Sequence, residues 1–80
     1  MDSKCIKSLI KKISECEPFE NDLYFNYRRD VVYDGITLSL DDINKREFIY
    51  LFHLCLQKID DNKLREEILA MIEILNNDRS

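Results

Sequence analysis

The chain has 80 residues, and its 12 Lys and Arg against 16 Asp and Glu give a formal net charge of −4. Apolar types supply 45% and charged types 35%, a composition typical of a folded rather than a disordered chain. The length allows one small domain over residues 1–80. The longest apolar run is far shorter than the roughly 20 residues that a membrane-spanning helix needs, so we expect no membrane span.

Residues 3–16 have the spacing of an amphipathic helix. Ser3 suits its N-cap, and Pro18 indicates that the helix ends before that position. Its apolar positions recur at intervals of three and four residues: Ile6, Leu9, Ile10, Ile13 and Cys16. The opposite side carries a basic stripe of Lys4, Lys7 and Lys11, with Lys12 beside it. We predict a solvated face there, with an anionic partner as the alternative.

The period changes to two between residues 22 and 38, which predicts three short strands in an antiparallel meander. The strands are expected at residues 23–28, 31–33 and 36–38, where aromatic and β-branched residues gather. Arg28-Arg29-Asp30 is predicted to turn the chain between the first two. Asp34-Gly35 is the strongest hairpin signal, because Gly accepts the positive φ that a type I′ turn requires.

Two helices are predicted after the meander. Ser39 followed by Asp42 resembles a capping box and starts a helix over about residues 40–59, which is apolar around most of its circumference. Asp60 or Asp61 is expected to cap a third helix, followed by a frayed tail at residues 76–80. The apolar stripe of the third helix is Leu64, Ile68, Met71, Ile72 and Leu75. The order α-β-β-β-α-α predicts an α+β fold with three helices packed on the small sheet.

Three cysteines and one histidine are the side chains that first suggest a metal site. Cys5 and Cys16 lie about 16 Å apart along a helix, so one zinc ion cannot reach both. His53 and Cys55 point about 200° away from each other on a helix. We therefore expect three buried, inert thiols, a structural role for His53, and no metal or cofactor. The odd cysteine number and the Lys-rich start without an apolar signal core favour the reducing cytoplasm.

Other catalytic motifs are missing from the sequence. The single glycine, Gly35, excludes a Gly-rich phosphate loop, and no serine lies in a nucleophile elbow. The adjacent carboxylates of Asp41-Asp42 and of Glu66-Glu67 lie near predicted helix starts, where they interact favourably with the helix dipole. We predict that the protein is not an enzyme.

Tyr and Arg side chains gather in the predicted meander, and these types dominate binding hot spots. The predicted protein-binding residues are Tyr24, Tyr27, Arg28, Arg29 and Tyr33. The alternative is that the Tyr rings cover the core and the Arg side chains flank a turn.

Some apolar side chains of the two later helices fall outside the stripes that face the core. These are Tyr50, Leu54, Leu69 and Ile74. Contiguous apolar surface usually marks an interface, and the commonest symmetric assembly is a two-fold dimer. We therefore predict a homodimer built on the second and third helices through these side chains. The alternative is that they contact a different protein.

Residues 31–40, 46–48 and 65–69 resemble the opening of a response-regulator winged-helix domain. In that family a short sheet leads into a helix with a similar Glu-Phe start, and another helix follows. The resemblance covers about half of the chain. No positions match the recognition helix or the wing, so no DNA-reading residue is carried over.

Together these features predict a small non-catalytic intracellular protein that occupies a surface of a larger protein. The bias toward Ile, Leu, Asp and Asn, with one residue each of Gly, Pro and Ala, is typical of AT-rich genomes. It favours an inhibitor or adaptor, of an anti-defence type, from a phage or mobile element. The alternative is a nucleic-acid-binding transcriptional regulator with a degenerate helix-turn-helix, in which the basic stripe and the meander arginines form one face.

Overall fold

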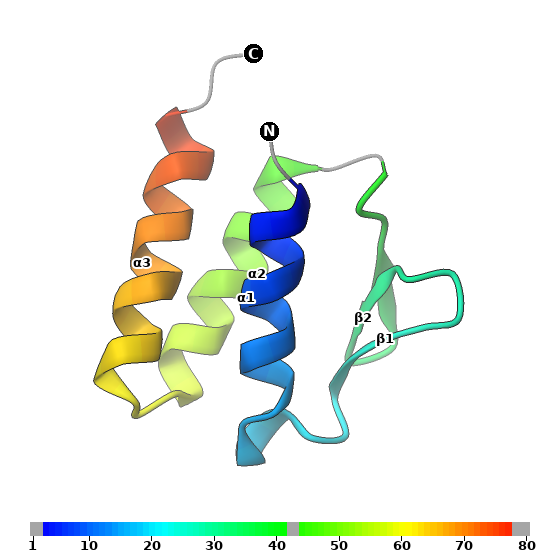
Figure 1. The fold of residues 1–80 in the computed structure, drawn as a ribbon, viewed down its shortest axis with the longest axis horizontal. Helices are drawn as coiled ribbons and strands as arrows, with labels where there is room; N and C mark the ends of the chain where they lie inside the picture. Colours follow the sequence, from blue (N-terminus) through cyan, green and yellow to red (C-terminus); the bar gives the residue numbers. More distant parts are fainter. Residues whose placement is uncertain (1–2, 42–43, 78–80) are drawn as a thin grey trace.

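The computed structural model describes residues 3–41 and 44–77, and it confirms the predicted order of elements. The elements are α1 (Ser3–Ser14), a 3₁₀ turn η1 (Glu17–Phe19), β1 (Leu23–Phe25), β2 (Val31–Tyr33), β3 (Ile36–Leu38), α2 (Lys45–Lys58) and α3 (Asn62–Asn77). α1 and α2 lie between α3 and the sheet (Figure 1). The fold is therefore α+β, with three helices and a small antiparallel meander.

The strands follow one another across the sheet in the order β1-β2-β3, and the two connecting loops differ. Asp34 and Gly35 have φ values of 50° and 83°, as a type I′ turn requires, so the predicted hairpin is confirmed. In the first loop the Arg29 N–H donates to the carbonyl oxygen of Asn26 at 2.9 Å, and Arg29 has a φ of 65°. This loop begins at Asn26, so β1 ends earlier than predicted, at Phe25.

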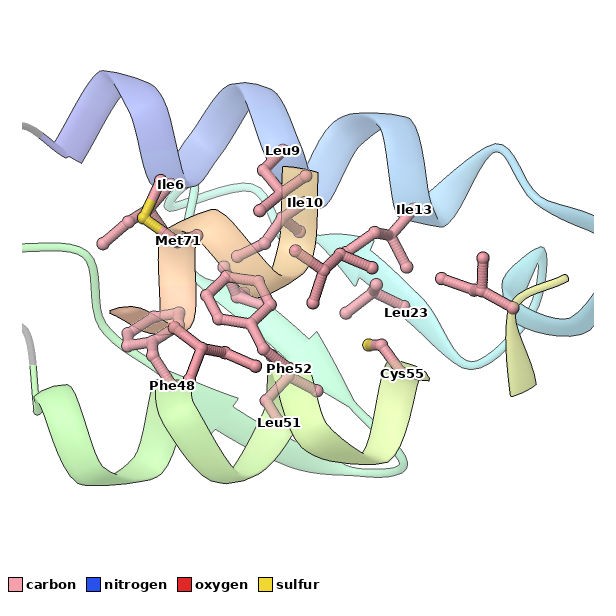
Figure 2. Packing of buried hydrophobic residues seen from close by; sticks show 14 of the residues in the cluster. Ile6, Leu9, Ile10, Ile13, Leu23, Phe48, Leu51, Phe52, Cys55 and Met71 are labelled. Atoms are coloured by element: carbon pink, nitrogen blue, oxygen red, sulfur yellow. The ribbon is translucent and has the colours of Figure 1, made fainter. Parts of the chain in front are cut away.

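The core lies between the helices and one face of the sheet. Figure 2 shows side chains of α1 and α2 pointing toward one another, with Met71 of α3 beside them. The labelled side chains from α1, β1 and α2 are Ile6, Leu9, Ile10, Ile13, Leu23, Phe48, Leu51, Phe52 and Cys55. Phe19 of η1 is also fully buried, although it lies outside every element predicted from the sequence.

α2 begins at Lys45, about five residues later than predicted. The Asn44 side chain accepts hydrogen bonds from two backbone N–H groups of the first turn, at 3.1 and 3.3 Å, and so forms the N-cap. The predicted cap is wrong because the Ser39 hydroxyl instead accepts from the Asp41 N–H at 3.2 Å, which closes a local turn. Asp42, the other half of the predicted box, lies outside the described residues.

The ends of the other helices also differ from the prediction. α1 ends at Ser14, so Cys16 lies beyond the helix rather than on its stripe. The Asp61 carboxylate accepts from the backbone N–H groups of Lys63 and Leu64, in the first turn of α3, at 3.0 and 3.3 Å, which confirms it as a cap. α3 continues through Asn76 and Asn77, so the predicted frayed tail is wrong there. Residues 78–80 lie outside the described part.

Arg65 connects α3 to the C-terminal end of α2. Its Nη1 donates to the carbonyl oxygens of Leu56 and Ile59, the second at 2.8 Å. Carbonyl groups at a helix C-terminus lack partners within the helix, and a cation satisfies them and the helix dipole together. This contact fixes α2 against α3. In the described residues, no helix is long and apolar enough to cross a membrane.

Candidate functional site

A groove of about 470 Å³ lies between α2 and the β2–β3 hairpin. Strand pairing places Tyr33 opposite Ile36, and strand alternation puts Leu38 on the same face of the sheet. The other wall comes from α2, where Tyr50 and Leu54 are four residues apart and share one side of the helix. The remaining lining residues are Asp34, Arg46, Glu47 and Leu51.

The groove combines a buried floor with two large exposed apolar side chains. Leu51 and Leu38 are buried and close it against the core. Ile36 is 64% exposed and Tyr50 is 67% exposed, although both line the groove. Ile36 lies next to the hairpin turn, at the end of its strand. These two side chains are the most accessible apolar groups of the groove, and a ligand seated in it would cover them.

The predicted Tyr and Arg cluster is not one surface. Tyr24 and Tyr33 lie on opposite faces of the sheet, because Tyr24 pairs with Val32, the residue before Tyr33. Tyr33 is half-buried, with its ring centroid 6.2 Å from that of Phe19, and it also lines the groove. Of the predicted binding residues of the meander, Tyr33 is therefore the one in the groove.

The other three residues of that cluster lie at or next to the loop between β1 and β2. Tyr27 is 88% exposed. The Arg28 guanidinium lies 5.5 Å from the Tyr27 ring centroid, and its Nε donates to the Tyr27 hydroxyl at 3.1 Å. Arg29 is exposed and holds the left-handed backbone position of the loop. The two side chains best placed for a partner therefore already contact each other.

The four predicted contact residues of the later helices also separate. Tyr50 and Leu54 line the groove. Leu69 and Ile74 lie on α3, five residues and so about 140° apart around the helix. Ile74 lines a second hollow, of about 400 Å³, between α1 and α3. Tyr50 and Leu54 therefore lie in one hollow and Ile74 in another, and the dimer contact through these side chains stays a prediction.

The α1–α3 hollow is bordered by charges that contact each other. The Lys12 ammonium lies 3.0 Å from a carboxylate oxygen of Glu67, and both residues line the hollow. An ion pair this exposed contributes about 0–1 kcal/mol. Lys12, on the basic side of α1, is therefore already paired with a carboxylate.

Over the described ranges, the groove beside α2 presents two exposed large apolar side chains, Ile36 and Tyr50, whereas the α1–α3 hollow presents one, Ile74. We therefore take the groove as the candidate site.

The cysteines do not share one environment. Burial raises the pKa of the Cys55 thiol to about 12, so this thiol is inert at neutral pH. Cys5 is exposed and Cys16 is half-buried, so the prediction of three buried thiols is wrong. Cys5 precedes the buried Ile6 and borders the α1–α3 hollow. Partial burial and neighbouring carboxylates raise the pKa of the Cys16 thiol.

His53 is exposed on α2, away from the core. Among the described residues, no group of three or more His, Cys, Asp or Glu side chains could hold a metal ion. In the part of the chain that the structure describes, the groove lining offers two carboxylates, one guanidinium and two phenols, and it contains no cysteine or histidine. This arrangement suits the binding of another molecule by apolar contact and hydrogen bonds.

Comparison with protein-family models, with curated proteins and with solved structures finds no match to this chain. The resemblance to a winged-helix domain therefore gains no support from these comparisons. Ile36 lines the groove but is not among the site residues predicted from the sequence. The available signal was its alternation with Leu38, which places both on the face shared with Tyr33, and its position next to the turn.

Proposed function

We propose that this protein is a small non-catalytic interaction domain that acts in the cytoplasm by occupying a surface of a larger protein. The observation that carries the proposal is the groove between α2 and the β2–β3 hairpin, with Ile36 and Tyr50 exposed in it. An inhibitor or adaptor encoded by a phage or mobile element, of an anti-defence type, is its concrete form. That origin is supported by composition alone.

The energetics favour a partner that contacts more than the two exposed side chains. Full burial of one large apolar side chain is worth about 1.5–3 kcal/mol. Association itself costs at least about 4 kcal/mol in lost translational and rotational freedom. Ile36 and Tyr50 can therefore anchor an interface, and Tyr33 and Leu54 beside them extend it. A macromolecular partner supplies such a continuous contact.

A homodimer is the second arrangement that we propose to test. Leu69 and Ile74 lie about 140° apart around α3, so the contact that we propose relies on the α2 side chains. A two-fold contact through Tyr50 and Leu54 remains available, because one self-complementary surface suffices. Sedimentation at tens of micromolar measures the mass directly. A mass near 9.6 kDa contradicts the dimer and leaves the groove to a different protein.

Nucleic-acid binding is supported by one specific feature, the exposed Tyr27 ring beside Arg28. Aromatic and Arg side chains together can stack on unpaired bases. The net charge of −4 opposes this function, since it repels a polyanion. A gel-shift titration at low and moderate salt distinguishes a nucleic-acid partner from a protein partner. Micromolar binding that weakens steeply with salt would favour nucleic acid over the protein partner.

The direct test compares two aspartate substitutions on exposed helical positions. Tyr50→Asp places a charge in the groove, and Ile74→Asp places the same charge in the α1–α3 hollow, at a side chain that is 55% exposed. The wild type and both variants are immobilised and used to capture proteins from a bacterial lysate. We expect one stoichiometric partner on the wild type and on Ile74→Asp, and its loss on Tyr50→Asp.

Circular dichroism and thermal unfolding of both variants show whether the fold is kept. A partner that binds all three proteins equally contradicts the groove as the site. Loss on both variants, with folds intact, indicates an interface that extends over both hollows. The absence of any stoichiometric partner contradicts the interaction function.

A further inference from the structure

We propose that the partner segment that enters the groove is an extended strand, which pairs with the outer edge of β3 and carries net positive charge. This inference rests on the proposed interaction function and names the chemistry of its ligand. It depends on which backbone N–H and C=O groups of the sheet point outward, on the direction of side chains at the edge, and on the charges of the groove.

Two hydrogen bonds at the ends of the β1–β2 ladder show which of its residue pairs are hydrogen-bonded. The Asp34 N–H donates to the Asp22 carbonyl oxygen, and the Asn26 N–H donates to the Asp30 carbonyl oxygen, each at 3.0 Å. Bonded pairs alternate along an antiparallel ladder. The bonded pair between these two ends is therefore formed by Val32, whose N–H and C=O point toward β1.

The same alternation determines which backbone groups point outward at the free edge of β3. Val32 is paired with Thr37 of β3. Because the Val32 N–H and C=O point toward β1, Thr37 forms no backbone hydrogen bonds to β2. The Thr37 N–H and C=O therefore point away from β2, on the outer side of β3. In the described part of the chain, β3 pairs with β2 alone. Thr37 is also exposed, so one donor and one acceptor face outward at an accessible edge.

This edge lies directly beside the groove. Ile36 and Leu38, on either side of Thr37, point to the groove face of the sheet and line it. An added strand would place one residue opposite Thr37, with its side chain on the outer face. The residues before and after it would point into the groove, over Ile36 and toward Tyr50. The expected ligand pattern is therefore apolar-x-apolar, with x paired to Thr37.

A helix does not meet these requirements, since its backbone groups are already bonded within the helix. An extended segment offers a C=O and an N–H as hydrogen-bond partners for the N–H and C=O of Thr37, which is the principle of strand addition. β3 has only three residues, so few backbone bonds can form. Most of the affinity must then come from the two apolar side chains in the groove.

Charge distinguishes the possible strands. Among the described residues, the groove is lined by the carboxylates of Asp34 and Glu47 and by the guanidinium of Arg46, which together carry one net negative charge. The chain as a whole has a net charge of −4. A second copy would fit the pattern through its own Ile36-Thr37-Leu38. It would, however, bring the same carboxylates to the contact, whereas a strand with Lys or Arg complements them.

The first experiment selects ligands without assuming a partner. A random peptide library displayed on phage is panned against the immobilised wild-type protein. We expect enriched peptides with the apolar-x-apolar pattern and more Lys and Arg than Asp and Glu. Enrichment of helical or acidic peptides, or no enrichment at all, overturns the proposal.

The second experiment tests strand pairing at Thr37 with the best selected peptide. Thr37→Pro removes the outward N–H and leaves the β2–β3 bonds untouched, and proline is tolerated at such edge positions. Thr37→Val keeps the N–H and serves as the matched control. We expect Thr37→Pro to weaken binding at least tenfold and Thr37→Val less than threefold. Equal affinity of both variants contradicts strand addition.

A ligand-side measurement covers the case in which Thr37→Pro fails to fold. The selected peptide is synthesised with and without N-methylation of the residue at position x, and both forms are titrated into wild-type protein. We expect the methylated form to bind at least tenfold more weakly, because it cannot donate to the Thr37 carbonyl. Unchanged affinity contradicts the pairing.

These outcomes separate this inference from the proposed function. If Tyr50→Asp releases the cellular partner but Thr37→Pro keeps it, the groove is an interaction site and strand addition is wrong. If both variants keep the partner, the groove is contradicted as the interaction site as well, and if the wild type captures no partner, the proposed function fails. A dimer of the wild type that Thr37→Pro dissociates and Thr37→Val preserves would show a second copy on the edge, and would overturn the choice of a basic strand.

Discussion

The two hairpin loops of the sheet both hold a residue in the left-handed backbone region, but the sequence supports them differently. In the β2–β3 loop this conformation falls on Asp34 and Gly35. In the β1–β2 loop it falls on Arg29, and the Asn26 side chain accepts from the Arg28 and Asp30 N–H groups at 2.9 Å each. One loop is thus favoured by glycine, and the other is held by a side-chain acceptor.

The loops also differ in what they present. The β1–β2 loop displays the Tyr27 and Arg28 side chains, which contact each other. The β2–β3 loop leads directly into Ile36 and the groove. Sequence density of Tyr and Arg pointed to the first loop, whereas exposed apolar surface gathers at the second. Hot-spot residue types therefore locate a site only when the fold brings them to one surface.

The largest effect that we expect from this comparison is on binding. Ile36→Thr keeps a β-branched residue in β3 but removes the apolar anchor, and should weaken partner binding by about 2 kcal/mol, near thirtyfold. Tyr27→Thr, in the other loop, should change the affinity less than threefold. Calorimetric titration with the captured partner measures both. Equal losses would assign the β1–β2 loop to the interface.

Local pattern was sufficient for the order of elements. Ile6, Ile10 and Ile13 set the period of α1, and Asp34-Gly35 specified the second turn. The start of α2 was wrong because Ser39 and Asn44 are both good caps, and local pattern does not choose between them. The Ser39 hydroxyl accepts from the Asp41 N–H in a local turn, which leaves Asn44 as the N-cap of α2.

The candidate site was less accessible from sequence than the fold. Ile36 and Tyr50 are 14 positions apart, and they come together because the hairpin packs beside α2. Tyr50 was predicted as a contact residue from its position off the core stripe. Ile36 was read only as a strand residue. Its exposure depends on how closely α2 covers this end of β3, which the period of the sequence does not specify.

Gly35→Val tests the glycine-favoured loop. Apart from Gly35 and its two chain neighbours, no residue has an atom within 4 Å of the position that a Cβ would take, so the whole cost comes from the left-handed backbone. For a β-branched residue we expect a loss of about 1–2 kcal/mol in the free energy of unfolding. Gly35→Asn should lose less than half of that, since Asn tolerates this conformation. Urea unfolding of both variants measures the difference, and equal stability would contradict the type I′ turn.

Asn26→Ala tests the loop that is held by a side-chain acceptor. It removes one acceptor from two backbone N–H groups, those of Arg28 and Asp30. We expect the free energy of unfolding to fall by about 1 kcal/mol. Asn26→Asp keeps an oxygen in the same place and should retain most of the stability. An alanine variant as stable as the wild type would show that the backbone bonds of the loop suffice alone.

The smallest expected effect has the opposite sign. Arg29 holds a φ of 65°, a conformation that is unfavourable for a residue with a Cβ and that glycine adopts readily. The Asn26 N–H donates to the Asp30 carbonyl oxygen, which leaves a three-residue hairpin loop with Arg29 at its third position, where a left-handed backbone favours glycine. Arg29→Gly relieves this strain but also increases the freedom of the unfolded chain, so we expect a net gain of about 0.5 kcal/mol.

Arg29→Ala separates the backbone effect from loss of the side chain. It removes the guanidinium but keeps the Cβ, so its stability should not exceed that of the wild type. Chemical unfolding of the three proteins under one set of conditions resolves the difference. A gain shared by glycine and alanine would assign the effect to the charge rather than to the backbone. Because this loop lies away from the groove lining, both variants should bind the partner as the wild type does.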